Sequence, residues 1–360
     1  MMRIYYLFFM ATLLVPFSGY SEVVSFNDKN WTFSGEITKK VTYAGQDALY
    51  ISEGSAVLKN AIFEDGIIEV DLIFPDDQRG FSGITWRMQE DDSYEHFYIR
   101  PHLSKQSDAS QYTPVFHGDT GWQLYFGPQY SVALEFKYNT WMHLKIVVAG
   151  DQAEIYLDSE KPVLYINDLK ADLPAGGIGI SSTFAPAYFA NFSYEKIDNP
   201  PLKGSPEPTP KLPENLITNI NVSDVIPDNI KSPSEYNGQW TRINMETNGA
   251  FNISRFRQRS ANHNTVLVKM TISSEYDTTR KFSYGYSDNA VAYINNTPLA
   301  GGTNVYQSRD YRYLGTIGLF DDIYLPLKKG KNEIYFAISE EFGGWGFMGK
   351  FENMDGLTLE

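Results

Sequence analysis

The chain has 360 residues and no cysteine, 42% of its residues are hydrophobic, 15% are aromatic, and its formal charge is −14. The length favours two domains over one, and the lack of cysteine excludes disulfides and zinc sites with thiolate ligands. Because 44 acidic residues outweigh 30 basic ones and no basic block occurs, we expect no binding to nucleic acid or to an anionic lipid surface.

The first residues have the pattern of a secretory signal. Arg3 precedes an apolar run over 4–17, and the small residues Gly19 and Ser21 stand at the −3 and −1 positions of a cleavage site before Glu22. The run is too short and wrongly flanked for a membrane-spanning helix. We therefore expect 1–21 to be a signal peptide, no later membrane span, and a periplasmic or extracellular location.

Short strands are predicted along the rest of the chain. Residues 66–74 alternate in polarity, and 141–158 read as a hairpin that turns at Gly150-Asp151. Further segments of strand character are 265–274, 281–288, 290–299 and 332–342. No long helical period occurs, which is typical of β-sandwiches or barrels.

A proline-rich segment divides the chain. Six prolines fall between Pro200 and Pro213, a density that prevents sheet pairing and favours an extended, semi-rigid spacer. The sequence therefore predicts an all-β fold of two antiparallel β-sandwich (jelly-roll) domains, 22–198 and 214–360, joined by a linker over 199–213.

The stretch "YEHFYIRPHLSKQSDASQY", residues 94–112, is the strongest candidate for a binding site. Strand alternation sends Phe97 and Ile99 to one face and a row of polar and aromatic side chains to the other: His96, Tyr98, Arg100 and His102. Guanidinium, imidazole and phenol groups supply directional hydrogen bonds and flat apolar surfaces, which is what sugars require. A structural alternative makes Arg100 a buried ion-pair partner of Glu95 or Asp71.

Neighbouring residues are expected to complete this ligand surface. If the preceding strand pairs with 94–99, Arg87 joins Arg100, while Gln111 and Tyr112 re-enter the sheet beside them after a polar loop over 103–110. Trp122 is a candidate platform for a sugar ring, with a core position as its alternative. The predicted ligand-binding set is His96, Tyr98, Arg100, His102, Arg87, Gln111, Tyr112 and Trp122.

The evidence for catalysis is incomplete. Glu69 and Asp71 are two carboxylates on one side of a strand, as in retaining glycosidases. The third carboxylate of laminarinase-type enzymes is missing, because that position holds Ile73 or Phe74. No catalytic residue is therefore assigned. No metal cluster or cofactor motif stands out, although the pairs Asp91-Asp92 and Asp321-Asp322 are candidates for structural calcium.

Several segments resemble known families. "FEDGIIEVDLIF", "FSGITWRMQEDDSYEHFYIRPH", "QYTPVFHG" and "YFANFSYEKI" are similar to the concanavalin A-like lectin/glucanase superfamily, more narrowly to laminin-G-like and DUF1080 (3-keto-disaccharide hydrolase) domains. "GYSDNAVAYINNTPL" and "YLPLKKGKNEIYFAISEEFGGWGF" resemble galactose-binding-like jelly rolls. The resemblance implies glycan binding by many members and hydrolysis by some.

Three functions compete at this point. The first is an exported carbohydrate-binding protein that acts on or near periplasmic or extracellular glycans, with a polysaccharide or oligosaccharide as its partner. The second is a glycoside hydrolase or lyase with an unusual set of catalytic groups, because His and Tyr are able to serve as general acid or base. The third is an envelope protein that contacts other proteins. The sequence does not specify the oligomeric state.

Overall fold

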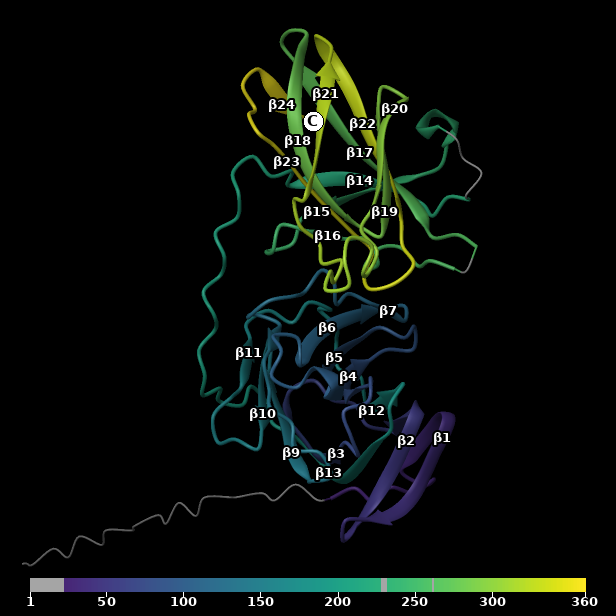
Figure 1. Cartoon of the computed structure of the whole chain (residues 1–360), viewed down its shortest axis with the longest axis vertical. Helices are drawn as coiled ribbons and strands as arrows, with labels where there is room; N and C mark the ends of the chain where they lie inside the picture. The colour runs from purple at the N-terminus through teal and green to yellow at the C-terminus, as the bar shows by residue number, and fades with distance from the viewer. Residues whose placement is uncertain (1–22, 228–231, 261) are drawn as a thin grey trace, which may run out of the picture.

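The computed structural model describes residues 23–227, 232–260 and 262–360, and these fold into two β-sandwich domains placed end to end (Figure 1). No α-helix occurs among them, and consequently no helix that could cross a membrane. The all-β fold class is therefore confirmed. The predicted signal peptide, 1–21, lies outside the described residues, so export stays a prediction.

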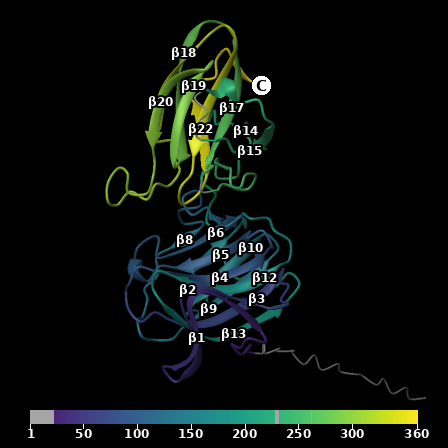
Figure 2. The same ribbon diagram turned by 90° about the vertical axis from the view of Figure 1, so that its right-hand side faces the viewer.

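The N-terminal domain is one continuous antiparallel sheet that curls around a single hydrophobic core (Figure 2). Its strand order is β11-β10-β9-β3-β13-β2-β12-β4-β5-β6-β7, with β1 paired to β2 and β8 paired to β6. The elements are β1 Trp31–Tyr43, β2 Gln46–Leu58, β3 Gly66–Ile73, β4 Phe81–Met88, β5 Tyr94–Ile99, the 3-10 turn η1 Pro101–Leu103, β6 Ser110–Phe116, β7 Asp119–Thr120, β8 Ser131–Val132, β9 Met142–Ala149, β10 Gln152–Leu157, β11 Leu164–Ile166, β12 Gly177–Thr183 and β13 Ala187–Lys196.

The C-terminal domain packs two antiparallel sheets against a second core. One sheet has the order β15-β14-β17-β22-β19-β20, with β24 paired to β17, and the other has the order β16-β23-β18-β21. The elements are β14 Asn219–Ser223, the 3-10 turn η2 Pro233–Glu235, β15 Trp240–Asn244, β16 Phe251–Asn252, β17 Thr265–Ser274, β18 Thr278–Ser287, β19 Asn289–Ile294, β20 Thr297–Thr303, β21 Asp321–Leu327, β22 Gly330–Ser339, β23 Gly346–Phe351 and β24 Leu357–Leu359.

The turn residues explain why one predicted hairpin agrees with the structure and why one predicted strand is in fact two strands. The hairpin of β9 and β10 turns at Gly150, whose φ of +61° lies in the left-handed region that glycine adopts without strain. The segment predicted as one strand over 290–299 is instead a hairpin of β19 and β20. Asn295 and Asn296 both have positive φ, 47° and 68°, the combination that a tight two-residue turn requires.

The proline-rich segment contains no strand, in agreement with its composition. Its beginning is attached to the N-terminal domain, because the buried carboxylate of Glu154 in β10 accepts hydrogen bonds from the backbone N–H groups of Lys203 (2.7 Å) and Gly204. The linker therefore leaves the first domain from a fixed point.

Candidate functional site

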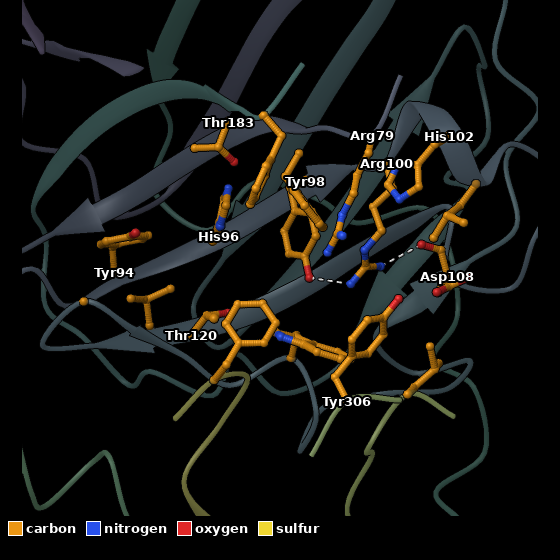
Figure 3. Close-up of a pocket in the computed structure, with 18 residues that line it drawn as sticks. Arg79, Tyr94, His96, Tyr98, Arg100, His102, Asp108, Thr120, Thr183 and Tyr306 are labelled. Atoms are coloured by element: carbon orange, nitrogen blue, oxygen red, sulfur yellow. Dashed lines mark hydrogen bonds between the residues drawn. The ribbon is translucent and has the colours of Figure 1, made fainter. Parts of the chain in front are cut away.

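A pocket of about 280 Å³ lies between the outer face of β4, β5 and β6 and two loops of the C-terminal domain (Figure 3). Aromatic side chains form much of its wall. The N-terminal domain contributes Phe81, Tyr94, Tyr98, Trp122 and Phe184, and the C-terminal domain contributes Tyr306 and Phe342. The wall of the pocket thus consists of aromatic side chains and of the polar groups described next.

The four residues of the predicted strand face all line this pocket. His96 and Tyr98 project from β5, Arg100 follows that strand directly, and His102 lies in the turn η1. Phe97 and Ile99 point the other way and are fully buried in the core. Strand alternation therefore accounts for His96, Tyr98 and Arg100. His102 was expected on the same strand face but reaches the pocket from the turn η1, where the alternation no longer applies. Ligand binding by the four residues stays a prediction.

Arg100 is held by neutral acceptors only. Its Nη1 donates to the Asp108 carbonyl at 2.6 Å, and its Nη2 donates to the Tyr98 hydroxyl and the Gln111 Oε1, each at 2.7 Å. Among the described residues no carboxylate forms an ion pair with it, and Glu95 and Asp71 have other partners. The alternative that made Arg100 a structural partner of one of these carboxylates is therefore wrong.

Gln111 and Tyr112 occupy different sides of β6 because adjacent residues in a strand alternate. Gln111 is fully buried under the pocket, where its Nε2 donates to the carbonyls of Trp122 (2.8 Å) and Tyr125 (2.5 Å). Its Oε1 must then face Arg100. Tyr112 lies in the core and donates to Glu95 at 2.6 Å. The expectation that both residues form the rim is wrong: Gln111 supports the pocket from below, and Tyr112 does not reach it.

Arg87 is also absent from the pocket wall, for a local reason. The pairing of β4 with β12 shifts register between Gly177 and Gly179, and Arg87 adopts a φ of +52° in this bulge. Its guanidinium turns to the Glu64 carbonyl (3.0 Å), the Asp65 carboxylate (3.0 Å) and the Gly150 carbonyl (2.7 Å). The expectation that Arg87 lies beside Arg100 is therefore wrong. It assumed that side chains alternate regularly along β4, and the bulge interrupts this alternation at Arg87.

Both histidines of the pocket are neutral near pH 7. Burial, reinforced by the Arg100 charge, lowers the pKa of His96 to about 3. The same two causes, burial first, lower the pKa of His102, whose Nδ1 lies 3.4 Å from the Gly80 backbone N–H. The Nε2 atom of His96 is buried and has no hydrogen-bond partner. Buried polar atoms without a partner are rare in proteins, so this nitrogen is a candidate contact for a bound molecule.

Several wall residues escaped sequence reasoning. Arg79 and the exposed Phe184 lie side by side, with the guanidinium 5.4 Å from the ring centre, and Phe184 has an unfavourable φ of +64°. Tyr306 and Phe342 come from the second domain, each about 6 Å from the Trp122 ring (6.1 and 6.0 Å). No sequence pattern connects residues so distant in the chain. Arg79 and Phe81 are different, because Phe81 begins the first strand of the predicted pair and Arg79 stands two residues before it.

The loop that carries Trp122 is held by the C-terminal domain through Gln123. Its side chain donates to the Leu314 carbonyl at 3.0 Å and accepts from the Ser287 hydroxyl at 2.8 Å. Its backbone N–H donates to the Gly343 carbonyl and its carbonyl accepts from Ile317, each at 2.9 Å. Gly343 allows this approach, because a Cβ there would lie 2.4 Å from the Gln123 Oε1. The second domain thereby fixes the residue next to Trp122.

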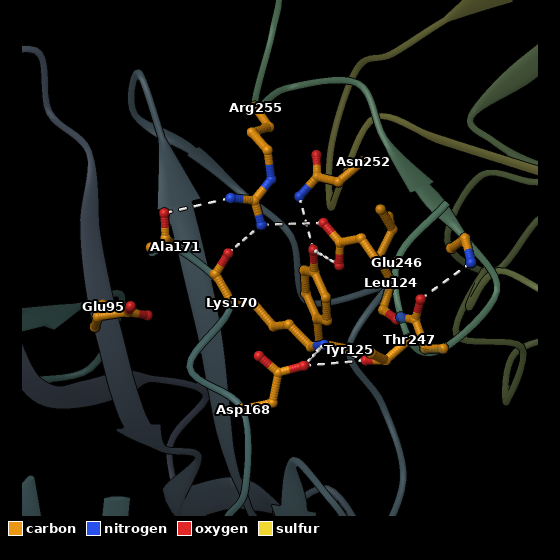
Figure 4. Close-up of polar contacts among 12 residues, drawn as sticks. Glu95, Leu124, Tyr125, Asp168, Lys170, Ala171, Glu246, Thr247, Asn252 and Arg255 are labelled. Carbon is orange, nitrogen blue, oxygen red and sulfur yellow. Dashed lines mark hydrogen bonds and ion pairs between the residues drawn. The ribbon is translucent and has the colours of Figure 1, made fainter. Parts of the chain in front are cut away.

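A second set of polar contacts joins the domains beside this loop (Figure 4). Tyr125 donates to Glu246 at 2.7 Å, and Glu246 also pairs with Arg255 at 3.1 Å. Arg255 in turn donates to the Lys170 carbonyl of the N-terminal domain, and the Lys170 ammonium contacts the Thr247 hydroxyl at 2.6 Å. The charges pair within each domain, Glu246 with Arg255 and Lys170 with Asp168, and hydrogen bonds cross the interface, so the two domains form one supporting frame for the pocket.

The carboxylates that suggested a glycosidase do not line the pocket. Glu69 and Asp71 both face His143 on β9, at 3.5 and 2.8 Å. Hydrogen bonds to Asp71 and Glu69 raise the pKa of His143 to about 9, so this cluster is an ion-pair network.

Three of the four candidate calcium ligands form ion pairs within the protein. Asp91 pairs with His117, Asp321 pairs with Arg309 and Asp322 pairs with Lys281. Within the described ranges no group of three or more His, Asp or Glu side chains is arranged to hold a metal ion. A structural calcium therefore stays an untested prediction.

No protein-family description and no curated protein matches the chain. Solved structures similar to it include a carbohydrate binding module from Bacillus subtilis (19% identity, 46% of this chain, 96% of that chain, TM-score 0.36) and a Bacillus licheniformis β-glucanase (11%, 49%, 96%, 0.35). A Flavobacterium laminarinase is similar at 9% identity, over 48% of this chain and 99% of that chain, with a TM-score of 0.37. At these values the likenesses carry no inference about what this chain binds. The DUF1080 and galactose-binding-like resemblances stay predictions.

The buried Glu95 predicts a pH-dependent stability. Burial raises its pKa from 4.5 to about 7, so between these values the folded state keeps a proton that the unfolded state releases, and the free energy of unfolding falls as the pH rises. At about 1.4 kcal/mol per pKa unit the loss is on the order of 3 kcal/mol by about pH 8. Glu95→Gln removes this loss and keeps an acceptor for Tyr112. In urea unfolding, the free energy of unfolding of the variant minus that of the wild type should increase from about pH 4 to about pH 8. A difference that stays constant over this range contradicts the prediction.

Gln123→Ala tests the contact that fixes the Trp122 loop. The substitution removes the donor to the Leu314 carbonyl, while the Ser287 hydroxyl keeps a contact with the Asp288 carboxylate at 3.2 Å. We expect a loss of roughly 1–3 kcal/mol in urea unfolding, which is the cost of one buried polar group left unpaired. The matched control is Gln106→Ala, at an exposed position, which should change stability by less than about 0.5 kcal/mol. Equal effects of the two variants would show that the contact does not hold the loop.

Proposed function

We propose that this protein is an exported saccharide-binding protein and that the pocket between its domains is the binding site. The observation that carries the proposal is the composition of the pocket wall. Flat rings of Trp122, Tyr98 and Tyr306 surround a buried guanidinium and two neutral imidazoles. Sugar rings present apolar faces that pack on aromatic plates and hydroxyl groups that need directional donors and acceptors.

The pocket also has the form of a small-molecule site. Ligand pockets typically have volumes of a few hundred Å³, an apolar lining and a few fixed polar groups, and this one has about 280 Å³. Its polar groups are held in place: Arg100 by Gln111, and Gln111 by the backbone of the Trp122 loop. Such fixed groups bind with a smaller loss of side-chain freedom. Export is proposed from the signal-like residues 1–21 alone.

The chemistry of the pocket favours binding over hydrolysis. Glycoside hydrolysis ordinarily uses a pair of carboxyl groups on either side of the scissile bond. Asp108 is the single carboxylate among the described residues of the wall. The neutral His96 and the Tyr98 hydroxyl, whose pKa is raised by burial, leave an elimination reaction as the second candidate. No observation favours the protein-contact alternative.

Tyr306→Ala tests whether the pocket binds saccharides. Removing this ring should weaken binding by about three- to tenfold, in line with the 0.5–1.5 kcal/mol of an aromatic contact. The thermal midpoint should fall by only about a few degrees, since the contact with Trp122 is lost as well. Tyr311→Ala is the control, because Tyr311 lies in the same loop, is 78% exposed and does not line the pocket. A glycan array selects the probe, and isothermal titration measures both variants.

The same saccharide then separates binding from catalysis. After long incubation with wild-type protein, an unchanged oligosaccharide supports binding without turnover. New reducing ends identify a hydrolase, and unsaturated ends identify a lyase. If no saccharide on the array binds, the proposed function is wrong.

A further inference from the structure

Arg100 is a buried positive charge that forms no ion pair with any carboxylate of the described residues. The residue is 5% exposed, and its three hydrogen bonds go to a carbonyl, a hydroxyl and an amide oxygen. Buried charges in proteins are normally paired, because an unpaired ion loses its hydration without compensation. Aromatic rings lie near the guanidinium, with the Tyr98 ring centre at 4.8 Å and the Trp122 ring centre at 5.9 Å. Ring faces attract cations but carry no formal charge.

The guanidinium also keeps unused donors. Arginine has five N–H groups, and three are taken by Asp108, Tyr98 and Gln111. The Nε–H and one Nη1–H therefore have no acceptor in the described part of the chain. The side chain lines the pocket (Figure 3), so these donors are available to a bound molecule.

Two further groups of the wall favour the same kind of ligand. Arg79, exposed beside Phe184, has no carboxylate partner among the residues that the structure describes. The buried Nε2 of His96 has no partner either. With both histidines neutral, two arginines and Asp108 leave the pocket one net positive charge, whereas the whole chain has a formal charge of −14. This local reversal of sign is what an anionic ligand needs.

We propose that the saccharide bound in this pocket is acidic and that its carboxylate or sulfate group binds to Arg100, with Arg79 contributing at the same wall. The proposal rests on the proposed function, since it names the class of saccharide. A guanidinium binds both kinds of oxyanion through charge-assisted hydrogen bonds, which are about twice as strong as neutral ones. The bound anion supplies a counter-charge that Arg100 does not find among the described residues, so acidic sugars are selected over neutral ones of the same shape.

Matched pairs of oligosaccharides test this selection. For the carboxylate, the probes are oligomers of galacturonate, glucuronate and mannuronate, each beside its carboxyl-reduced form. For the sulfate, the probe is a sulfated galactan oligomer beside its desulfated form. Isothermal titration should show at least one acidic member binding more than about tenfold tighter than its neutral partner. Its affinity should fall with added sodium chloride, which screens the charge.

Variants then locate the selection in the pocket. The preference is the ratio of the two affinities, acidic over neutral, measured in the same variant. Arg100→Met should remove this preference, and Arg79→Gln should reduce it by about threefold or more. Lys161→Gln is the control, because it changes the net charge equally at an exposed position outside the pocket. If Arg100→Met does not fold, Arg79→Gln and the salt dependence decide, since the exposed Arg79 supports no buried contact.

The outcomes separate the two proposals. Equal affinity for both members of every pair overturns the acidic selection and leaves saccharide binding standing. Tighter binding of the neutral members also overturns the acidic selection and leaves saccharide binding standing. If no member of any pair binds while another saccharide of the array does, the acidic selection is wrong and the proposed function stands. A preference that survives in Arg79→Gln and Arg100→Met alike shows that the acidic group binds elsewhere, and it also overturns the inference.

Discussion

The side-chain amide of Gln111 links the buried Arg100 of the pocket to the loop that carries Trp122. Its two N–H donors are taken by the carbonyls of Trp122 and Tyr125, which leaves its oxygen to the guanidinium of Arg100 and the hydroxyl of Tyr98. An amide buried this deeply must satisfy all of its hydrogen-bonding capacity. One residue thus sets the position of the buried cation on one side and of the aromatic loop on the other.

The Trp122 loop depends in turn on the second domain. Gln123 and Tyr125 form hydrogen bonds across the interface. Trp122 precedes Gln123 in the chain, its carbonyl accepts a hydrogen bond from Gln111, and its ring lines the pocket. Charged groups at this interface, such as Glu246 and Arg255, are paired with each other and form hydrogen bonds to the opposite domain. Pairing keeps the cost of burying them low. Arg100 differs from these residues, because its hydrogen-bond partners are all neutral. Charges that support the fold are paired in this chain, whereas the charge in the pocket forms no ion pair within the described ranges.

Local periodicity explains what the sequence could predict. The alternation of 94–102 placed His96, Tyr98 and Arg100 on one face, because a regular strand has a period of two. The same rule excludes Tyr112 from the face of Gln111, and applying it there would have corrected the expectation. Arg87 was beyond this reasoning, since a bulge in the partner pairing reverses its side.

Other features have no local signal at all. Tyr306 and Phe342 reach the pocket only through the docking of two domains, which depends on contacts between residues far apart in the chain. The hairpin at Asn295 and Asn296 is different, because two adjacent asparagines are a turn signal that a longer strand assignment concealed. The fold class follows from composition and alternation, whereas the shape of the pocket follows from tertiary packing.

The shared wall of the pocket has a thermodynamic consequence. A molecule that touches Arg100 and Tyr306 together contacts both domains, so its binding energy adds to the energy that keeps them docked. Undocking of the domains and departure of the ligand then belong to one linked equilibrium. Whatever loosens the interface raises the dissociation constant, and whatever fills the pocket protects the interface, by the same factor in each direction.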